Sequence, residues 1–126
     1  MAANPIAQVS LRELGPGRPI LFEFERGGEN LSGFILEYEN ELHAYVNRCP
    51  HVTYPLDFAD GELMDPTRKF IMCQAHGARF LPETGECFWG PALGRSLERL
   101  PCKRDGEFAR VEITPEIEGW PACGGG

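Results

Sequence analysis

The sequence lacks long apolar runs and has few positive charges. No stretch approaches the roughly eighteen apolar residues of a membrane-spanning helix. Lys and Arg number 12 against 19 Asp and Glu, which gives a net charge of -7 and a pI near 4.9. Phosphate binding requires clustered cations, so this balance argues against a nucleic-acid partner and favours a basic protein surface. The N-terminus, MAANPIAQVSLREL, has neither a basic leader nor the apolar segment of a signal peptide, so we expect a cytoplasmic protein without membrane contact.

Cysteine and histidine are also scarce, with five and three residues respectively. An odd number of cysteines in a chain without a secretory leader is poorly explained by a disulfide framework, and metal binding explains it better. The 15 glycines and 11 prolines favour many turns over long helices. A chain of 126 residues is expected to form one domain with its own core.

Alternating apolar and polar residues predict half-buried β-strands. The apolar faces are expected to comprise Ile20, Phe22 and Phe24, then Phe34, Leu36 and Tyr38, and finally Ala109, Val111 and Ile113. Glu39-Asn40, Thr84-Gly85 and Asp105-Gly106 each separate two strand-like runs, as hairpin turns do. Only residues 10–14 have a helical pattern, and Gly15-Pro16-Gly17 ends it. The expected fold is an all-β domain of short antiparallel strands, closed as a sandwich or a small barrel.

Two Cys/His pairs interrupt this alternation. Cys49-Pro50-His51 follows the strand-like HAYVN, and Cys73-Gln74-Ala75-His76 follows KFIM, so both pairs are expected on loops at strand ends. Two thiolates and two imidazoles in two close pairs predict a metal centre. A zinc site of two Cys and two His is one reading, although zinc sites commonly pair Cys with Cys and His with His.

The order Cys-x-His and then Cys-x-x-His resembles the Rieske [2Fe-2S] proteins, in which two cysteines bind one iron and two histidines the other. ELHAYVNRCPH resembles the strand that leads into the first cluster loop of that family. CQAHGARFLPETGE resembles the second loop and its hairpin, and GPALGRSLERL resembles the proline loop that covers the cluster. The resemblance implies a Rieske-type [2Fe-2S] cluster with Cys49, His51, Cys73 and His76 as its ligands.

The resemblance covers roughly residues 5 to 115 and implies a single Rieske domain over residues 1–120. Its antiparallel sandwich or small barrel base would comprise about residues 5–44 and 96–116. A cluster-binding subdomain of two loops would be inserted at about residues 45–95, and residues 121–126 would form a flexible tail. The interval from Val52 to Met72 is longer than expected for compact Rieske ferredoxins, and a longer surface loop costs little free energy.

High-potential relatives have an extra cysteine in each loop and Ser and Tyr hydroxyls that donate hydrogen bonds near the cluster. Here no cysteine lies between Val52 and Leu56, and Ala78 and Phe80 stand where the hydroxyl donors would be. Fewer hydrogen bonds to sulfur stabilise the reduced cluster less. The chain therefore resembles the low-potential, ferredoxin-type branch, near the bottom of the Rieske range of roughly −150 to +300 mV.

The resemblance implies a one-electron carrier that takes electrons from a flavin-type reductase and delivers them to a terminal oxygenase or other oxidoreductase. The chain is not expected to be an enzyme, because it has no nucleophile–base pair, phosphate loop or dinucleotide fingerprint and no room for a mononuclear iron domain. Two alternatives are a small Rieske subunit of a larger oxidoreductase, such as a nitrite-reductase-like complex, and a zinc-stabilised binding module.

Several other residues are given structural roles. His43 is expected on a strand, and Cys87 and Cys102 as small buried residues. Cys123 is expected to be a mobile thiol. Trp89 is expected in the core, with an apolar rim around the histidines as the alternative for Phe88, Trp89 and Pro91.

Overall fold

The computed structural model describes residues 4–15, 17–50, 55–56, 63–74, 77–91 and 93–115. These residues form β-strands and no helix, which confirms the all-β prediction. The strands are β1 (Ile6–Ser10), β2 (Ile20–Arg26), β3 (Glu29–Tyr38), β4 (Glu41–Val46), β5 (Ile71–Met72), β6 (Arg79–Phe80), β7 (Cys87–Trp89), β8 (Arg99–Leu100), β9 (Cys102–Asp105) and β10 (Phe108–Glu112). None of the described residues belongs to a helix that could cross a membrane.

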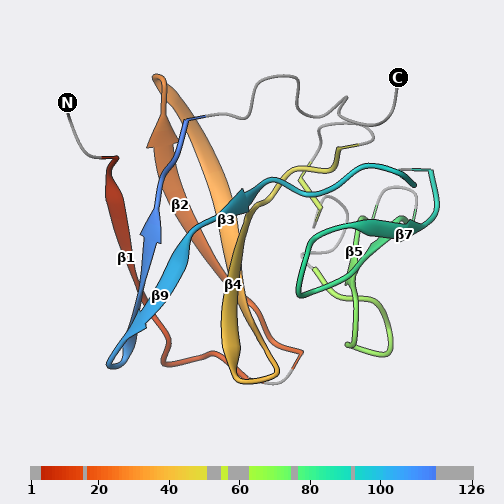
Figure 1. Cartoon of the computed structure of the whole chain (residues 1–126), viewed down its shortest axis with the longest axis horizontal. Coiled ribbons are helices and arrows are strands. Elements are labelled where there is room, and N and C mark those ends of the chain that lie inside the picture. The colour runs from red at the N-terminus through yellow and green to blue at the C-terminus, as the bar shows by residue number, and fades with distance from the viewer. Residues whose placement is uncertain are drawn as a thin grey trace.

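The strands form three antiparallel sheets, which Figure 1 shows side by side. Their orders are β1-β10-β9, β2-β3-β4-β8 and β5-β6-β7. The first two sheets, here called the base, enclose one core, whereas β5-β6-β7, here called the site sheet, packs toward the opposite face of the four-stranded sheet. In the described part of the chain the base sheets remain open, so the base is a sandwich and not a closed barrel.

Strands β2 and β10 are half-buried, as their alternation predicts. Phe22 and Phe24 are buried between exposed neighbours in β2, and Ala109 and Val111 occupy the same kind of position in β10. These four side chains belong to the core between the two base sheets. A strand with one face in water thus has the two-residue period that the sequence shows.

The prediction of half-buried strands is wrong for the centre of the four-stranded sheet. Phe34 and Leu36 of β3 and Tyr45 of β4 pack in the core on the site side. Ile35 and Ala44 point to the other face and pack in the base core. Because both faces are covered, consecutive residues are all buried and the alternation disappears. The central sheet therefore connects the two cores.

Two turns fix how the strands meet. Glu39 and Asn40 form the two-residue loop between β3 and β4, with φ of 52° and 65°, as a type I′ hairpin requires. Pro101 separates β8 from β9, and the chain passes there from the four-stranded to the three-stranded sheet. Proline has no N–H to donate, so it fits this corner, where its carbonyl accepts a hydrogen bond from Glu112 N at 2.9 Å.

A polar network around the buried side chains of His43 and Tyr45 connects the base to the hairpin that follows the site sheet's β6. Arg99 in β8 lies 2.9 Å from His43 Nδ1 and donates to the Tyr45 hydroxyl at 3.1 Å and to Glu83 O at 2.8 Å. The Tyr45 hydroxyl donates to Pro82 O at 2.7 Å, and burial raises the pKa of Tyr45 to about 12. A guanidinium only donates, so His43 Nδ1 must be an unprotonated acceptor. Burial, and then the charge of Arg99, lower the pKa of His43.

Acidification is therefore expected to destabilise the protein through His43. In the unfolded chain this imidazole binds a proton with a pKa near 6.5, whereas the folded state resists protonation until a lower pH. The free energy of unfolding should fall as pH drops below about 6.5 and level off below the folded-state pKa.

Urea unfolding from pH 7.5 to 5.0 checks this, with His43→Gln as the comparison because an amide oxygen can still accept from Arg99 and does not titrate. As the pH falls, the free energy of unfolding of the wild type should decrease relative to that of the variant. A difference that stays constant across this range would contradict the assignment.

Candidate metal centre

The first ligand loop begins where β4 ends and is closed by the side chain of Asn47. Asn47 N donates to Ser32 O at 2.8 Å, and its amide Nδ2 donates to Ser32 Oγ at 3.2 Å, which ties the residue to β3. Its Oδ1 accepts from Leu56 N at 2.8 Å. The buried amide thereby joins the two described ends of the loop, with Cys49 between them. His51 lies outside the described residues.

The second ligand loop follows β5 and closes on itself. Cys73 N donates to Ala78 O, and Gly77 N donates to Cys73 O, both at 2.8 Å. Gly77 has a φ of 77°, a conformation that side chains disfavour, so glycine lets the chain turn back into β6. His76 lies outside the described residues, so only the cysteine end of the predicted Cys73/His76 pair is placed.

The two loops are hydrogen-bonded to each other. Gln74 N, next to Cys73, donates to Leu56 O at 2.9 Å, while Leu56 N is held by Asn47. Cys49 and Cys73 are both fully buried and belong to the same apolar cluster. The structure thus brings two of the four predicted ligands into one core.

A third loop, of which residues 90–91 and 93–96 are described, contacts both ligand loops. Arg95 Nη1 donates to Pro50 O at 3.0 Å, immediately after Cys49. On the other side, a Cβ added to Gly90 would lie only 2.8 Å from the Ala78 Cα, so the two backbones touch. Both contacts come from the segment GPALGRSLERL, and its expected role of covering a cluster stays a prediction. The sequence patterns did not single out Asn47 or Arg95, because their roles depend on hydrogen bonds to residues that are not neighbours in the sequence.

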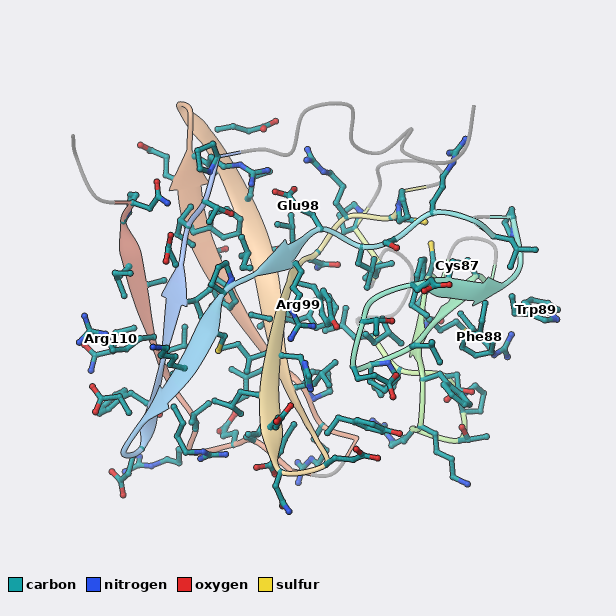
Figure 2. The ribbon with its side chains drawn as sticks, in the orientation of Figure 1. Cys87, Phe88, Trp89, Glu98, Arg99 and Arg110 are labelled. Carbon is teal, nitrogen blue, oxygen red and sulfur yellow. The ribbon has the colours of Figure 1, made fainter. Side chains whose placement is uncertain are left out.

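Trp89 is not a core residue, so that expectation was wrong. Its side chain is 55% exposed and lies at the end of the molecule, where Figure 2 shows it beside Phe88. The Arg79 guanidinium lies over the indole ring, 5.0 Å from the ring centroid. The same ring lies against Gly77. Phe88 and Leu93 are exposed nearby in sequence.

Of the cysteines outside the predicted ligand set, Cys87 is buried as expected, and Cys102 is partly buried. Cys123 lies outside the described residues.

A buried carboxylate next to the first ligand loop forms ion pairs with two arginines. Glu98 is 0% exposed and is bound by Arg26 with two contacts, Nη1–Oε2 at 2.6 Å and Nη2–Oε1 at 3.1 Å. Arg48 Nη2, from the residue before Cys49, lies 3.7 Å from Oε1. No sequence pattern indicates this group, because its members Arg26, Arg48 and Glu98 come from three separate segments of the chain.

A family model described as "Rieske [2Fe-2S] domain" matches residues 5–112. The chain belongs to the Rieske [2Fe-2S] domain family. Members of this family bind a [2Fe-2S] cluster with two cysteines on one iron and two histidines on the other. No curated protein sequence gives a significant match.

Solved Rieske structures share the fold of the chain. The ferredoxin of carbazole 1,9a-dioxygenase from Nocardioides aromaticivorans IC177 matches with a TM-score of 0.64 at 23% identity, over 88% of this chain and 98% of that chain. The terminal oxygenase of carbazole 1,9a-dioxygenase from Novosphingobium sp. KA1 matches with a TM-score of 0.70 at 16% identity, over 94% of this chain but 34% of that chain.

The two described cysteines fit the part of the family's cluster in which one iron is bound by two thiolates. Two thiols are buried in one apolar cluster, on loops whose backbone groups are hydrogen-bonded to each other. Among the described residues alone, no three Cys, His, Asp or Glu side chains could hold a metal ion. His51 and His76 lie outside the described residues and stay predicted ligands.

The contact between Gly90 and Ala78 predicts a position-specific effect of alanine in the third loop. Gly90→Ala adds a Cβ where the Ala78 backbone lies, at a φ of 101°, and should destabilise the protein by about 1–3 kcal/mol and lower its iron content.

Gly94→Ala is the matched control, because Gly94 has a similar φ of 89° but no atom within 4 Å of the added Cβ. Thermal unfolding and iron analysis of both variants should show the greater loss for Gly90→Ala. Equal losses would mean that backbone strain alone, and not packing on the second ligand loop, is responsible.

Proposed function

We propose that this protein is a one-electron carrier of the ferredoxin type, with a Rieske [2Fe-2S] cluster held by Cys49, His51, Cys73 and His76. It takes electrons from a flavin-type reductase and delivers them to a terminal oxygenase. The buried placement of Cys49 and Cys73 on two connected loops carries the proposal. The match to 98% of a dioxygenase ferredoxin, against about a third of an oxygenase chain, supports a carrier over an enzyme.

The bound cluster supplies reversible transfer of one electron. The residues of the chain exclude water from the cysteines and hold their loops. Phe34, Tyr45 and Leu56 contribute to the apolar cluster around Cys49 and Cys73, and the loop hydrogen bonds limit movement of the two sulfurs. A site that changes little in shape on reduction suits electron transfer. The exposed Trp89, which lies against Gly77, supports placing the partner contact at this end of the molecule.

A partner of this kind is known among the structural relatives. One chain of the reduced complex between oxygenase and ferredoxin in carbazole 1,9a-dioxygenase matches at 20% identity with a TM-score of 0.65, over 91% of this chain and 30% of that chain. By analogy, we propose a terminal oxygenase as acceptor and a flavin reductase as donor, with both reactions in the cytoplasm. The proposed domain boundaries, a base at about 5–44 and 96–116 around a cluster-binding part at about 45–95, stay predictions.

The metal content tests the cofactor directly. The purified protein should contain about two iron and two acid-labile sulfide per chain. Cys49→Ser and Cys73→Ser should each lose the cluster and its visible absorption. Cys87→Ser is the matched control, because Cys87 is buried in the same apolar cluster but is not a predicted ligand. A colourless protein with one zinc per chain would support the zinc-stabilised binding module instead.

The reduction potential tests the carrier assignment. Ala78 and Phe80 are fully buried and have no hydroxyl, so the potential should lie near the bottom of the Rieske range, roughly −150 mV. Ala78→Ser or Phe80→Tyr should raise it, since a hydrogen bond of about 1 kcal/mol corresponds to roughly 40 mV for one electron. Phe108→Tyr adds the same hydroxyl on an exposed base strand and should have no effect.

Dye-mediated titration of the isolated protein gives these values. A reversible one-electron transition in a stable monomer agrees with a carrier. A protein that is isolated only as a tight complex with a larger oxidoreductase would favour the subunit alternative.

A further inference from the structure

The carboxylate of Glu98 lies between the base and the first ligand loop. Figure 2 shows Glu98 at the entry to β8, between the sheets of the base and the site sheet. It is 0% exposed and makes a two-pronged ion pair with Arg26 of β2. Arg26 Nη1 also lies 3.3 Å from Thr114 O. The carboxylate is therefore fixed to the base by its strongest contacts.

A second cation reaches the same carboxylate from the ligand loop. Arg48 Nη2 lies 3.7 Å from Glu98 Oε1, and the Arg48 side chain is 16% exposed. One carboxylate between two guanidiniums leaves a net charge of +1 in this group, which lies next to Cys49 in the chain. Burial of an ion pair rarely adds stability over apolar packing, so its position beside a ligand requires another explanation.

The backbone around Glu98 reinforces this position. Val46 N, at the end of β4, donates to Glu98 O at 2.9 Å, and Leu97 N donates to Gly85 O at 2.8 Å. Arg95 holds Pro50 O. The first ligand loop is thus contacted on both sides of Cys49, through Arg48 before it and Pro50 after it.

We propose that Glu98 is a positioning residue for the cluster: through Arg48 it fixes the first ligand loop and keeps a positive charge next to Cys49. This inference rests on the proposed function, since it concerns the potential of the bound cluster. Reduction adds one negative charge to the site, and a nearby cation stabilises that state. With Arg48 held in place the potential is higher than it would be if this guanidinium turned into water, where its charge is screened.

Substitutions that conserve charge separate positioning from a simple change of charge. Glu98→Asp keeps the carboxylate but withdraws it by one methylene, so it cannot hold both arginines. The formal charge of the protein is unchanged, and a shift in potential then reports the movement of Arg48. Glu37→Asp is the matched control, because Glu37 pairs with Arg104 at 2.8 Å on the exposed surface of the base.

Dye-mediated redox titration of the cluster-loaded proteins, with visible circular dichroism of the cluster, is the test. Glu98→Asp and Arg48→Gln should both lower the potential, so that the reduced-to-oxidised ratio at a fixed potential falls about threefold or more. The double variant should match Arg48→Gln alone, because Glu98 acts through Arg48. Glu37→Asp should match the wild type.

An unchanged potential and spectrum in Glu98→Asp would overturn the inference, as would an additional shift in the double variant. If Glu98→Asp fails to fold, Arg48→Gln decides, because this partly exposed side chain can be replaced without an empty core site, and an unchanged potential there is equally decisive. Iron and sulfide content distinguishes this failure from that of the proposed function. A wild-type protein without a [2Fe-2S] cluster refutes the function, whereas a cluster-loaded protein with unaffected variants refutes only the role of Glu98.

Discussion

The two hydrogen bonds made by the backbone of Leu56 hold the predicted metal centre together. Its N–H donates to the Asn47 side chain of the first loop, and its carbonyl accepts from Gln74 of the second. Buried peptide groups are costly to leave unpaired, so the loops have little freedom to separate. Cys49 and Cys73 consequently share one apolar cluster, although they come from different strand ends. The ligand arrangement thus depends on main-chain contacts as much as on the ligands themselves.

The central sheet supports this arrangement because it is covered on both faces. Residues of β3 and β4 alternate between the base core and the site core, so that movement of one core would disturb the other. The Tyr45 hydroxyl extends the connection to Pro82, in the hairpin between β6 and β7, and Gly85 contacts the Tyr45 ring. Close packing of this kind resists small displacements. The base is therefore a rigid platform for the loops.

The sequence predicts the parts of the structure that meet water on one side. The alternation in β2 and β10 is visible because only one face is buried, and Glu39-Asn40 is recognisable because a type I′ turn restricts its residues. The same reasoning fails in β3 and β4, where burial on both faces removes the period, and at Trp89, where an aromatic residue in a short strand is exposed. Cys49 and Cys73 were found from motif spacing, whereas Asn47, Arg95 and Glu98 depend on contacts that no local pattern records.

The electrostatics of the site also depend on contacts between distant segments, so they must be taken from the structure. The overall charge of -7 suggests an acidic environment everywhere. Yet the charged group nearest to Cys49 in the chain is Arg48, and its buried partner Glu98 is shared with Arg26. Ala78 and Phe80 offer no hydroxyl to the second loop, which disfavours reduction, while this local positive charge favours it. The potential of such a site reflects the balance of these two short-range effects, and the screened surface charge contributes much less.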